Sequence, residues 1–154
     1  MLHPADDAFL ARLARHLPPG TLGPPEDRHL TDPRRRMTGS AAAVARPRRT
    51  DEVATIVAAC AAARVGIIPW GGGTGLVLGQ LTATGPACLI LSLERMTAIR
   101  DRHPTENVLV AEAGAILSDV HTAAGALDRI FPLALASQGS ARIGGLLSTN
   151  AGGV

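Results

Sequence analysis

A glycine-rich stretch near the middle of the chain constrains the fold more than any other feature. Four of the five residues 71–75 are glycine, and they follow the apolar residues 65–68. Glycine has no Cβ and accepts positive φ, so successive N–H groups can turn toward one point. Such a concave group of amides binds anions, phosphate above all. A sharp turn without a ligand is the alternative, because turns are where glycine is most common.

Two familiar phosphate-binding loops are excluded by the residues around these glycines. A Walker A loop needs a lysine to reach the phosphates, and all 15 basic residues of this chain are arginine. A Rossmann fingerprint needs a third glycine that opens a helix, but Leu76 stands there after Gly71 and Gly73. Residues 76–82 have no amphipathic helical pattern. A phosphate bound here would be held by backbone amides without a helix behind them.

Composition narrows the class of protein. The chain has 154 residues, the length of one domain, and its net charge is only +2. Its arginines are scattered and have no aromatic neighbours, which argues against a nucleic-acid groove. No apolar run approaches a membrane span, and the polar start of the chain is unlike a signal peptide. The two cysteines, Cys60 and Cys88, favour buried thiols in a cytoplasmic protein over a disulfide framework.

The N-terminal residues predict one helix and a connector. Residues 5–17 have a helical apolar stripe, and Asp6 or Asp7 is expected to cap it. Residues 21–33 are polar and proline-rich, and are expected to connect this helix to the rest. The basic run at 34–36 favours a solvated surface over an anion site.

A β-α-β unit is predicted next. Residues 41–46 suit a short buried strand, and Thr50 is a favourable N-cap for a helix that Gly66 ends. Residues 67–69 form the strand that leads into the glycine loop. Two strands joined by a helix in this way should run parallel.

The second half of the chain alternates between apolar runs and one amphipathic segment. We expect the first two of its predicted strands to share a sheet with an open edge, which invites pairing with another chain. The predicted elements are strands at 87–93 and 107–113, a helix at 115–126 and a short strand at 130–135.

Residues 136–153 form a second glycine-rich stretch. It mixes five glycines with three serines, Thr149 and Asn150. Small hydroxyl groups and exposed amides suit a long polar ligand, which needs close approach and many donors. Alone, this stretch could be a loop at a chain end. Two such stretches on one sheet-based scaffold favour a shared ligand site.

Motifs spread over residues 30–154 resemble a known family, the FAD-linked oxidases with the vanillyl-alcohol oxidase/p-cresol methylhydroxylase-type (PCMH-type) flavin domain. The branch they resemble most is the D-2-hydroxy acid dehydrogenases, which act on D-lactate, glycolate or D-2-hydroxyglutarate. The motifs are Pro69-Trp70-Gly71-Gly72-Gly73-Thr74-Gly75-Leu76, Arg46-Pro47 with Asp51-Glu52-Val53, Leu91-Ser92-Leu93-Glu94-Arg95-Met96, Ala111-Glu112-Ala113-Gly114, Ser137-Gln138-Gly139-Ser140, Ile143-Gly144-Gly145 and Ser148-Thr149-Asn150-Ala151-Gly152-Gly153.

The resemblance implies an α/β (α+β) fold with two subdomains. A small parallel β-α-β subdomain would be followed by an incomplete second subdomain with a mixed sheet. Residues 1–33 would be an N-terminal helix and connector, and residues 34–154 the FAD-binding domain, truncated at its C-terminal end. The family's substrate domain, with its catalytic histidine and metal ligands, follows this segment, so no catalytic or metal-binding residue is expected here.

The resemblance also implies which residues contact FAD. Backbone amides of 71–75 would hold the pyrophosphate, and the second stretch would line the ribose, the phosphate and the isoalloxazine ring. Several family members attach flavin through a histidine where this chain has Thr74, so FAD should be non-covalent. The expected cofactor-binding residues are Pro69, Trp70, Gly71, Gly72, Gly73, Thr74, Gly75, Leu76, Ser137, Gly139, Ser140, Ile143, Gly144, Gly145, Thr149, Asn150 and Gly152.

Three residues depart from the family pattern: Leu78, Arg142 and Leu146. Arg142 could pair with phosphate or point to solvent, and solvent is favoured. Two other functions remain open. The chain could be a module that binds FAD or another nucleotide and needs a partner chain, or an inactive truncated product. We expect no nucleic-acid partner and no membrane span.

Overall fold

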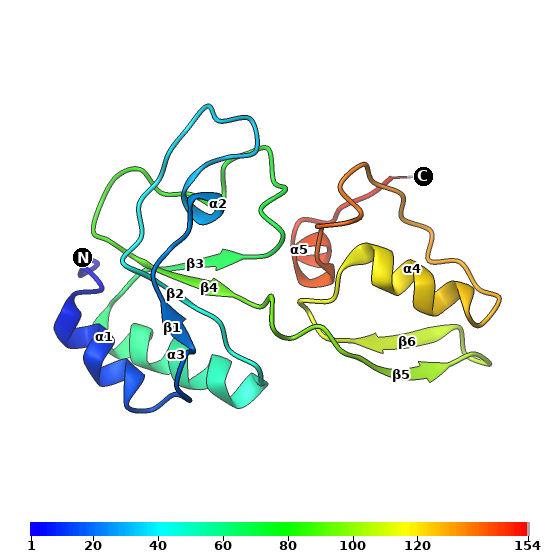
Figure 1. Ribbon diagram of the computed structural model, residues 1–154, viewed down its shortest axis with the longest axis horizontal. Helices are drawn as coiled ribbons and strands as arrows, with labels where there is room; N and C mark the ends of the chain where they lie inside the picture. The colour runs from blue at the N-terminus through cyan, green and yellow to red at the C-terminus, as the bar shows by residue number, and fades with distance from the viewer. Residues whose placement is uncertain (154) are drawn as a thin grey trace.

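The computed structural model describes residues 1–153 and shows two parts side by side (Figure 1). The first part holds a four-stranded sheet with helices packed on it, and the second holds a two-stranded sheet with two further helices. The elements are α1 (Asp7–Ala14), β1 (Leu22–Gly23), α2 (Asp27–Leu30), β2 (Ala43–Ala45), α3 (Thr50–Ala63), β3 (Ile67–Trp70), β4 (Leu89–Ser92), β5 (Ile99–His103), β6 (Val108–Ala111), α4 (Leu117–Gly125) and α5 (Ile143–Ser148).

Strand β4 lies between β2 and β3 in the first sheet, whose strand order is β1-β2-β4-β3. Strands β2 and β3 both run parallel to β4, with Val44 and Ile68 each opposite Ile90, while β1 is antiparallel to β2. The predicted parallel orientation of the β-α-β unit is confirmed. Its two strands are not neighbours, however, because β4 lies between them.

Both faces of this sheet are buried. Helices α1 and α3 cover one face, and the short helix α2 lies on the opposite side (Figure 1). Successive residues of a strand point to opposite faces. Accordingly Leu89 packs under α1 and α3, whereas Ile90 packs with Val44, Trp70 and Leu30 of α2. Burial on both faces explains why the predicted strands read as short continuous apolar runs.

The first two long helices lie where the sequence predicts them, with one corrected cap. The Asp6 carboxylate accepts the Phe9 N–H at 2.8 Å and caps α1, as predicted. Thr50 is not the N-cap of α3; Arg49 is, and Thr50 is already helical. The carboxylate of Glu52 accepts the Arg48 N–H at 2.8 Å and fixes the chain ahead of the helix.

The end of α3 and the connector also differ from the sequence prediction. Arg64, at φ 54°, caps α3, whereas Gly66 accepts the Leu89 N–H at 3.0 Å in the sheet. Residues 21–33 are not simply a connector, since they contain β1 and α2. Strand β1 is short, and its place is fixed by pairing with β2 rather than by its own sequence.

The second part corrects the predicted sheet. Residues 87–93 and 107–113 do not share a sheet: the first contributes β4, and the second contributes β6, which pairs antiparallel with β5. Residues 130–135 form no strand in the described chain, while the helix predicted at 115–126 is confirmed as α4. The mixed sheet and the antiparallel sheet match the expected α/β class. Within residues 1–153, no helix combines the length and apolar character needed to cross a membrane.

The burial of Leu89 gives a test of this core. Leu89 is fully buried at the centre of the sheet, so Leu89→Ala should lower the free energy of unfolding by about 2–5 kcal/mol. Val77 is 91% exposed, and the loss of two apolar carbons in Val77→Ala should change the free energy of unfolding by less than about 0.5 kcal/mol. Urea unfolding followed by Trp70 emission measures both. Equal unfolding midpoints for the two variants would contradict this core.

Candidate functional site

The first glycine-rich loop begins where β3 leaves the sheet. Trp70 is the last residue of β3 and pairs with Ser92, and Gly71 follows directly. Because β3 and β4 are parallel, the loop lies at the carboxyl ends of both strands. Both arrows point toward α5 and the second part of the molecule in Figure 1. Ligands of parallel sheets bind outside this end of the strands.

The two glycine-rich stretches meet in space. A Cβ on Gly72 would lie 2.0 Å from the carbonyl oxygen of Ser140 and 3.2 Å from the Cα of Ala141. A Cβ on Gly71 would lie 3.9 Å from the Cα of Gly145. The contact is therefore backbone against backbone, and it exists only because Gly72 has no side chain. The sequence prediction that these stretches form one site agrees with this contact.

The amides of the first loop are available to a ligand. Within residues 1–153, the N–H groups of 71–75 donate to no protein acceptor. Two carbonyl groups at the end of the loop do have protein donors. Gln80 Nε2 donates to the Gly75 oxygen at 2.8 Å, and Arg36 Nη2 donates to the Leu76 oxygen at 3.2 Å. Free amides beside anchored carbonyls fit a phosphate-binding nest.

The second stretch uses several of its amides internally. Ile143 N donates to the Ala115 oxygen at 3.0 Å, and Gly144 N donates to the Ala113 oxygen at 2.7 Å. A Cβ on Gly144 would lie 2.9 Å from the Ala113 Cβ, so α5 packs directly against the chain that follows β6. These bonds fix the start of α5 and leave fewer amides for a ligand than the sequence suggests.

The other expected residues of the second stretch lie around α5. The Ser140 N–H donates to the Ser137 oxygen at 2.9 Å, and the Thr149 hydroxyl donates to the Gly145 oxygen at 2.9 Å. Asn150 follows α5 at φ 49°, a left-handed conformation that asparagine tolerates better than most residues. Gly139 and Gly152 have open space where a Cβ would stand.

Trp70 lies beneath the loop rather than on its surface. Its side chain is 5% exposed and packs against the ring of His29, with 4.7 Å between ring centroids. The guanidinium carbon of Arg28 lies 5.3 Å from the centroid of the indole ring, within cation–π range. A Cβ on Gly73, whose φ is 69°, would lie 2.7 Å from Trp70 Cζ2. The indole thus supports the loop from below.

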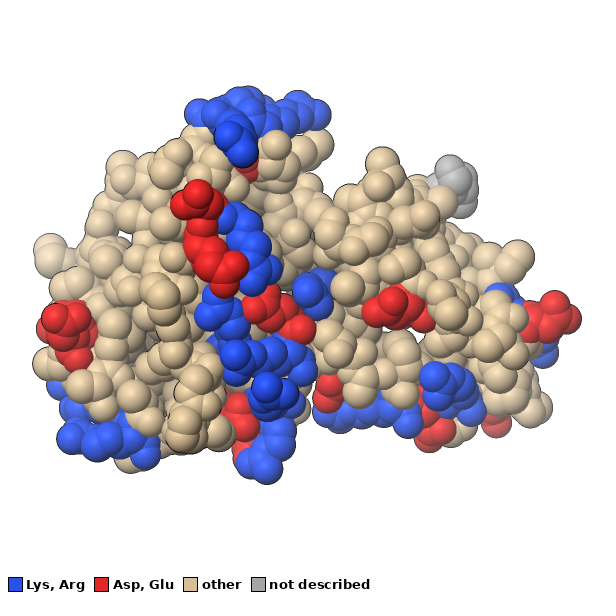
Figure 2. All heavy atoms as spheres, viewed as in Figure 1, with Lys and Arg blue, Asp and Glu red and all other residues tan. Residues whose placement is uncertain are grey.

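Alternating charges surround Arg28 at the border of the two parts. Glu94 pairs with Arg28 at 2.9 Å and with Arg46 at 2.7 Å, and Glu26 contacts both arginines. Figure 2 shows acidic and basic side chains side by side over the middle of this face. Burial acts to raise the pKa of Glu94, but the hydrogen bonds and charges of Arg28 and Arg46 outweigh it, and the pKa is lowered.

Arg142 does not point to solvent, and the favoured sequence interpretation is wrong. Its side chain is half-buried, and Nη1 donates to the carbonyl oxygen of Gly114. Its Nε is buried and has no partner within residues 1–153. Burial lowers the pKa of the guanidinium group, and the neighbouring Arg28 lowers it further. The residue lies between the two parts of the molecule. Its position in the sequence gave no indication that it would be buried.

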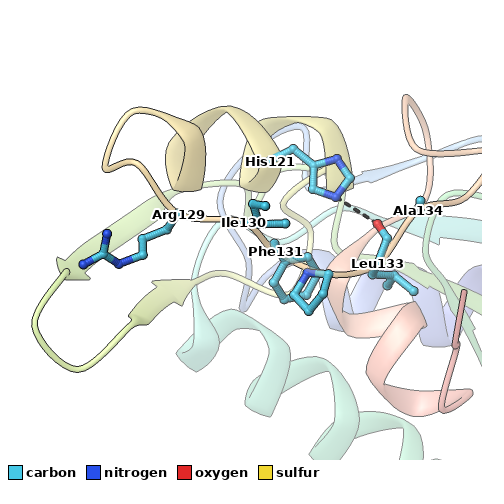
Figure 3. Close-up of a pocket in the computed structure, with 7 residues that line it drawn as sticks. His121, Arg129, Ile130, Phe131, Leu133 and Ala134 are labelled. Carbon is cyan, nitrogen blue, oxygen red and sulfur yellow. Dashed lines mark hydrogen bonds between the residues drawn. The ribbon is translucent and has the colours of Figure 1, made fainter. Parts of the chain in front are cut away.

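Two hollows of the molecule lie away from the first loop. A cavity of about 510 Å³ lies among β6, α4 and α5 and is lined by apolar side chains such as Leu109, Val120 and Leu147. A second hollow, of about 380 Å³, lies between α4 and the segment that follows it. Figure 3 shows its lining residues, among which His121 Nε2 and the Leu133 oxygen are 2.9 Å apart. Neither is lined by residues 69–76, whereas Ile143 of the second stretch lines the cavity of about 510 Å³.

The cysteines are buried, and the histidines of the described residues form no metal-binding cluster. Cys60 and Cys88 are buried free thiols, as predicted, and burial raises the pKa of Cys60 to about 11. Within residues 1–153, no group of three or more His, Cys, Asp or Glu side chains has a geometry that could hold a metal ion.

Comparison with known proteins adds a family to this geometry. A model of the family described as "FAD binding domain" matches residues 41–154. D-2-hydroxyglutarate dehydrogenase of Xanthomonas citri pv. viticola is 39% identical over 120 residues, which are 78% of this chain and 25% of that protein. The mitochondrial D-2-hydroxyglutarate dehydrogenase of Bos taurus is 36% identical over 149 residues, 94% of this chain and 27% of that protein. The chain thus spans about a quarter of the length of these curated relatives.

Solved structures share the fold at low sequence identity. An alkyldihydroxyacetonephosphate synthase superposes with a TM-score of 0.83 at 18% identity, over 99% of this chain and 30% of that one. Phl p 4, a grass pollen allergen with glucose dehydrogenase activity, superposes with a TM-score of 0.75 at 18% identity, over 89% of this chain and 30% of that one. These neighbours confirm the expected two-part fold.

A matched pair of glycines tests the contact between the stretches. Gly72→Ala places a Cβ against the Ser140 oxygen and should separate the two stretches, whereas Gly79 has nothing within 4 Å of the same atom. Neither glycine has positive φ, so backbone strain does not distinguish them. We expect Gly72→Ala to lower the melting temperature by several degrees, a cost of about 1–3 kcal/mol for overpacking, and Gly79→Ala to leave it unchanged. Thermal unfolding followed by circular dichroism measures this, and identical melting curves would refute the contact.

Proposed function

The chain belongs to the family of FAD binding domains, and from this we propose that it is the N-terminal part of a flavin-dependent oxidoreductase that oxidises a D-2-hydroxy acid. FAD would lie where the two glycine-rich stretches meet. The observation that carries this proposal is the row of free amides at 71–75, held beside Ser140 by a contact that no side chain could enter. A pyrophosphate is the part of FAD that such amides recognise.

We assign different roles to the two stretches. The amides of Gly71 to Gly75 bind the pyrophosphate, with Trp70 packed beneath them. Residues of the second stretch contribute mainly through shape and side-chain atoms, because several of their amides are already bonded to protein. The remaining proposed contacts are Pro69, Leu76, Ser137, Gly139, Ser140, Ile143, Gly144, Gly145, Thr149, Asn150 and Gly152.

The substrate is proposed from the relatives that carry the name D-2-hydroxyglutarate dehydrogenase, so a small D-2-hydroxy acid is the expected class. When bound, FAD would supply the redox chemistry by accepting a hydride from the carbon that carries the hydroxyl group. The residues of this chain bind and orient the cofactor. The groups that hold the substrate and accept its hydroxyl proton would lie in the remaining three quarters of a protein like these relatives.

A second candidate is an FAD-binding module that works with a separate partner chain. The apolar side chains left exposed on the second part favour further polypeptide over it, either a C-terminal continuation or a partner. Ile130 is 89% exposed and Leu147 is 75% exposed, both beside the cavity between α4 and α5. We place the protein in the cytoplasm, although several relatives are named as mitochondrial enzymes.

Non-covalent attachment of FAD follows from Thr74. A threonine hydroxyl does not form the bond that a histidine ring nitrogen makes to flavin, so acid precipitation of the loaded protein should release all of the flavin. The absorbance of the supernatant and of the washed pellet near the flavin maximum measures the two fractions. Yellow colour that stays in the pellet would contradict the assignment.

The residues present in this chain also predict its behaviour as an enzyme. Alone, it should bind FAD weakly and show no oxidation of D-lactate or D-2-hydroxyglutarate with an artificial electron acceptor, because the proposal assigns the groups that hold and deprotonate the substrate to the part of the relatives that this chain does not span. Addition of the C-terminal three quarters of a relative, as a fusion, should restore turnover. Turnover by this chain unaided would contradict the proposal, and restoration by a separate chain would favour the partner-dependent module.

A further inference from the structure

His29 is held as a neutral ring by its surroundings. It is 0% exposed, and its Nδ1 accepts the backbone N–H of Glu26 at 3.0 Å. A neutral imidazole has one donor and one acceptor nitrogen, so this bond places the ring proton on Nε2. Nε2 has no hydrogen-bond partner within residues 1–153. A second proton would have to enter on Nδ1, where the Glu26 N–H already points.

A continuous line of contacts joins this ring to the glycine loop. The ring of His29 packs on the indole of Trp70 at a 60° interplanar angle, and Trp70 is the last residue of β3. The indole lies so close under Gly73 that a Cβ there would be 2.7 Å from it. Gly73 has φ 69°, so the loop turns at the residue that the indole supports. The conformation of the free amides therefore depends on where Trp70 stands.

The charges that face His29 come from its own helix and cap and from two other segments. Arg28 precedes it on α2, Arg46 follows β2, Glu26 precedes α2 and Glu94 follows β4. Burial lowers the pKa of His29 below its ordinary 6.5, Arg28 and Arg46 lower it further, and Glu26 and Glu94 oppose them without prevailing. Trp70, on β3, carries no charge. The surroundings as a whole favour the neutral ring.

We propose that His29 is a positioning residue for the glycine loop, acting through Trp70, and that protonation of its ring releases FAD in acid. The inference rests on the proposed function, because FAD is the ligand of that loop. A proton on Nδ1 sets two donors against each other and puts a charge in a buried place. Helix α2 must then move away, and the support of Gly73 moves with it.

The sign of the pH dependence follows from the lowered pKa. Above about pH 6.5 the ring is neutral whether or not the loop is in place, and FAD affinity is complete. As the pH falls below this value toward the lower pKa of His29 in the folded chain, the fraction of chains with a protonated His29 ring grows. The affinity for FAD falls accordingly. The dissociation constant rises by up to about tenfold per pH unit between the pKa of His29 in the FAD-free chain and its lower pKa in the FAD-bound chain, and it levels off below the latter.

Two substitutions separate this role from simple packing. In His29→Gln the side-chain oxygen can accept the Glu26 N–H, as glutamine does in a capping box, but the side chain cannot titrate. His29→Leu fills a similar volume and loses the acceptor. Flavin fluorescence during titration with FAD, from pH 8 to pH 5, gives the dissociation constant of each. Circular dichroism at each pH reports whether the chain remains folded.

We expect the parent to lose FAD affinity in acid and His29→Gln to keep one dissociation constant, within about twofold, over the whole range. His29→Leu should bind more weakly at every pH, with no acid transition of its own. The other four histidines remain in both variants and serve as internal controls. The same acid loss in His29→Gln as in the parent would overturn the inference.

Trp70 gives a second measurement that needs no FAD. It is the only tryptophan of the chain, so its emission reports its environment without interference. Emission of the parent should change between pH 7 and pH 5, and that of His29→Gln should not. A transition in both proteins, or in neither, would overturn the role of His29. If no protein binds FAD at any pH, the proposed function fails, while the emission result still decides whether His29 controls Trp70.

Discussion

The distance between the two parts of the molecule is set by main-chain contacts that leave no room for a side chain. A Cβ on Gly72 would lie 2.0 Å from the Ser140 oxygen, and one on Gly114 would lie 1.8 Å from the Leu93 oxygen. Arg142 adds a bond from the second stretch to the Gly114 carbonyl. The two glycine-rich stretches therefore meet through backbone, while the charged cluster of Arg28, Arg46, Glu26 and Glu94 lies at the same border.

Sequence patterns predicted those helices and strands whose own residues carry a periodic or continuous apolar pattern. The apolar stripe of α1, the buried run of β4 and the position of the glycine loop could all be predicted, because burial demands a period or a run in the sequence. Helix α5 could not, since Gly144 and Gly145 are poor helix formers. Bonds from Ile143 and Gly144 to residues 115 and 113 hold it in place. Strand β5 is almost wholly polar, and only its pairing with β6 reveals it.

The candidate site divides in the same way. That the two glycine-rich stretches share one place could be predicted, because close backbone approach favours glycine. The individual FAD contacts stay a prediction. The side chains that pack around these stretches could not be predicted from the sequence. Trp70 is covered by Arg28 and His29 only because α2 folds across the second face of the sheet, and residues 21–33 carry no periodic signal for that helix. The burial of Arg142 likewise depends on where α5 docks.

The position of β4 between β2 and β3 has a consequence for how the chain is made. Strands β2 and β3 each pair with β4 and not with one another, so the parallel pairing of the first sheet has no template until residues 89–92 exist. On a ribosome, which exposes the chain from its N-terminus, α1 and α3 emerge well before that strand. Their apolar faces, which include Leu13 and Ile56, remain uncovered until the sheet forms. The first part can therefore complete its fold only after Leu89 to Ser92 have been synthesised.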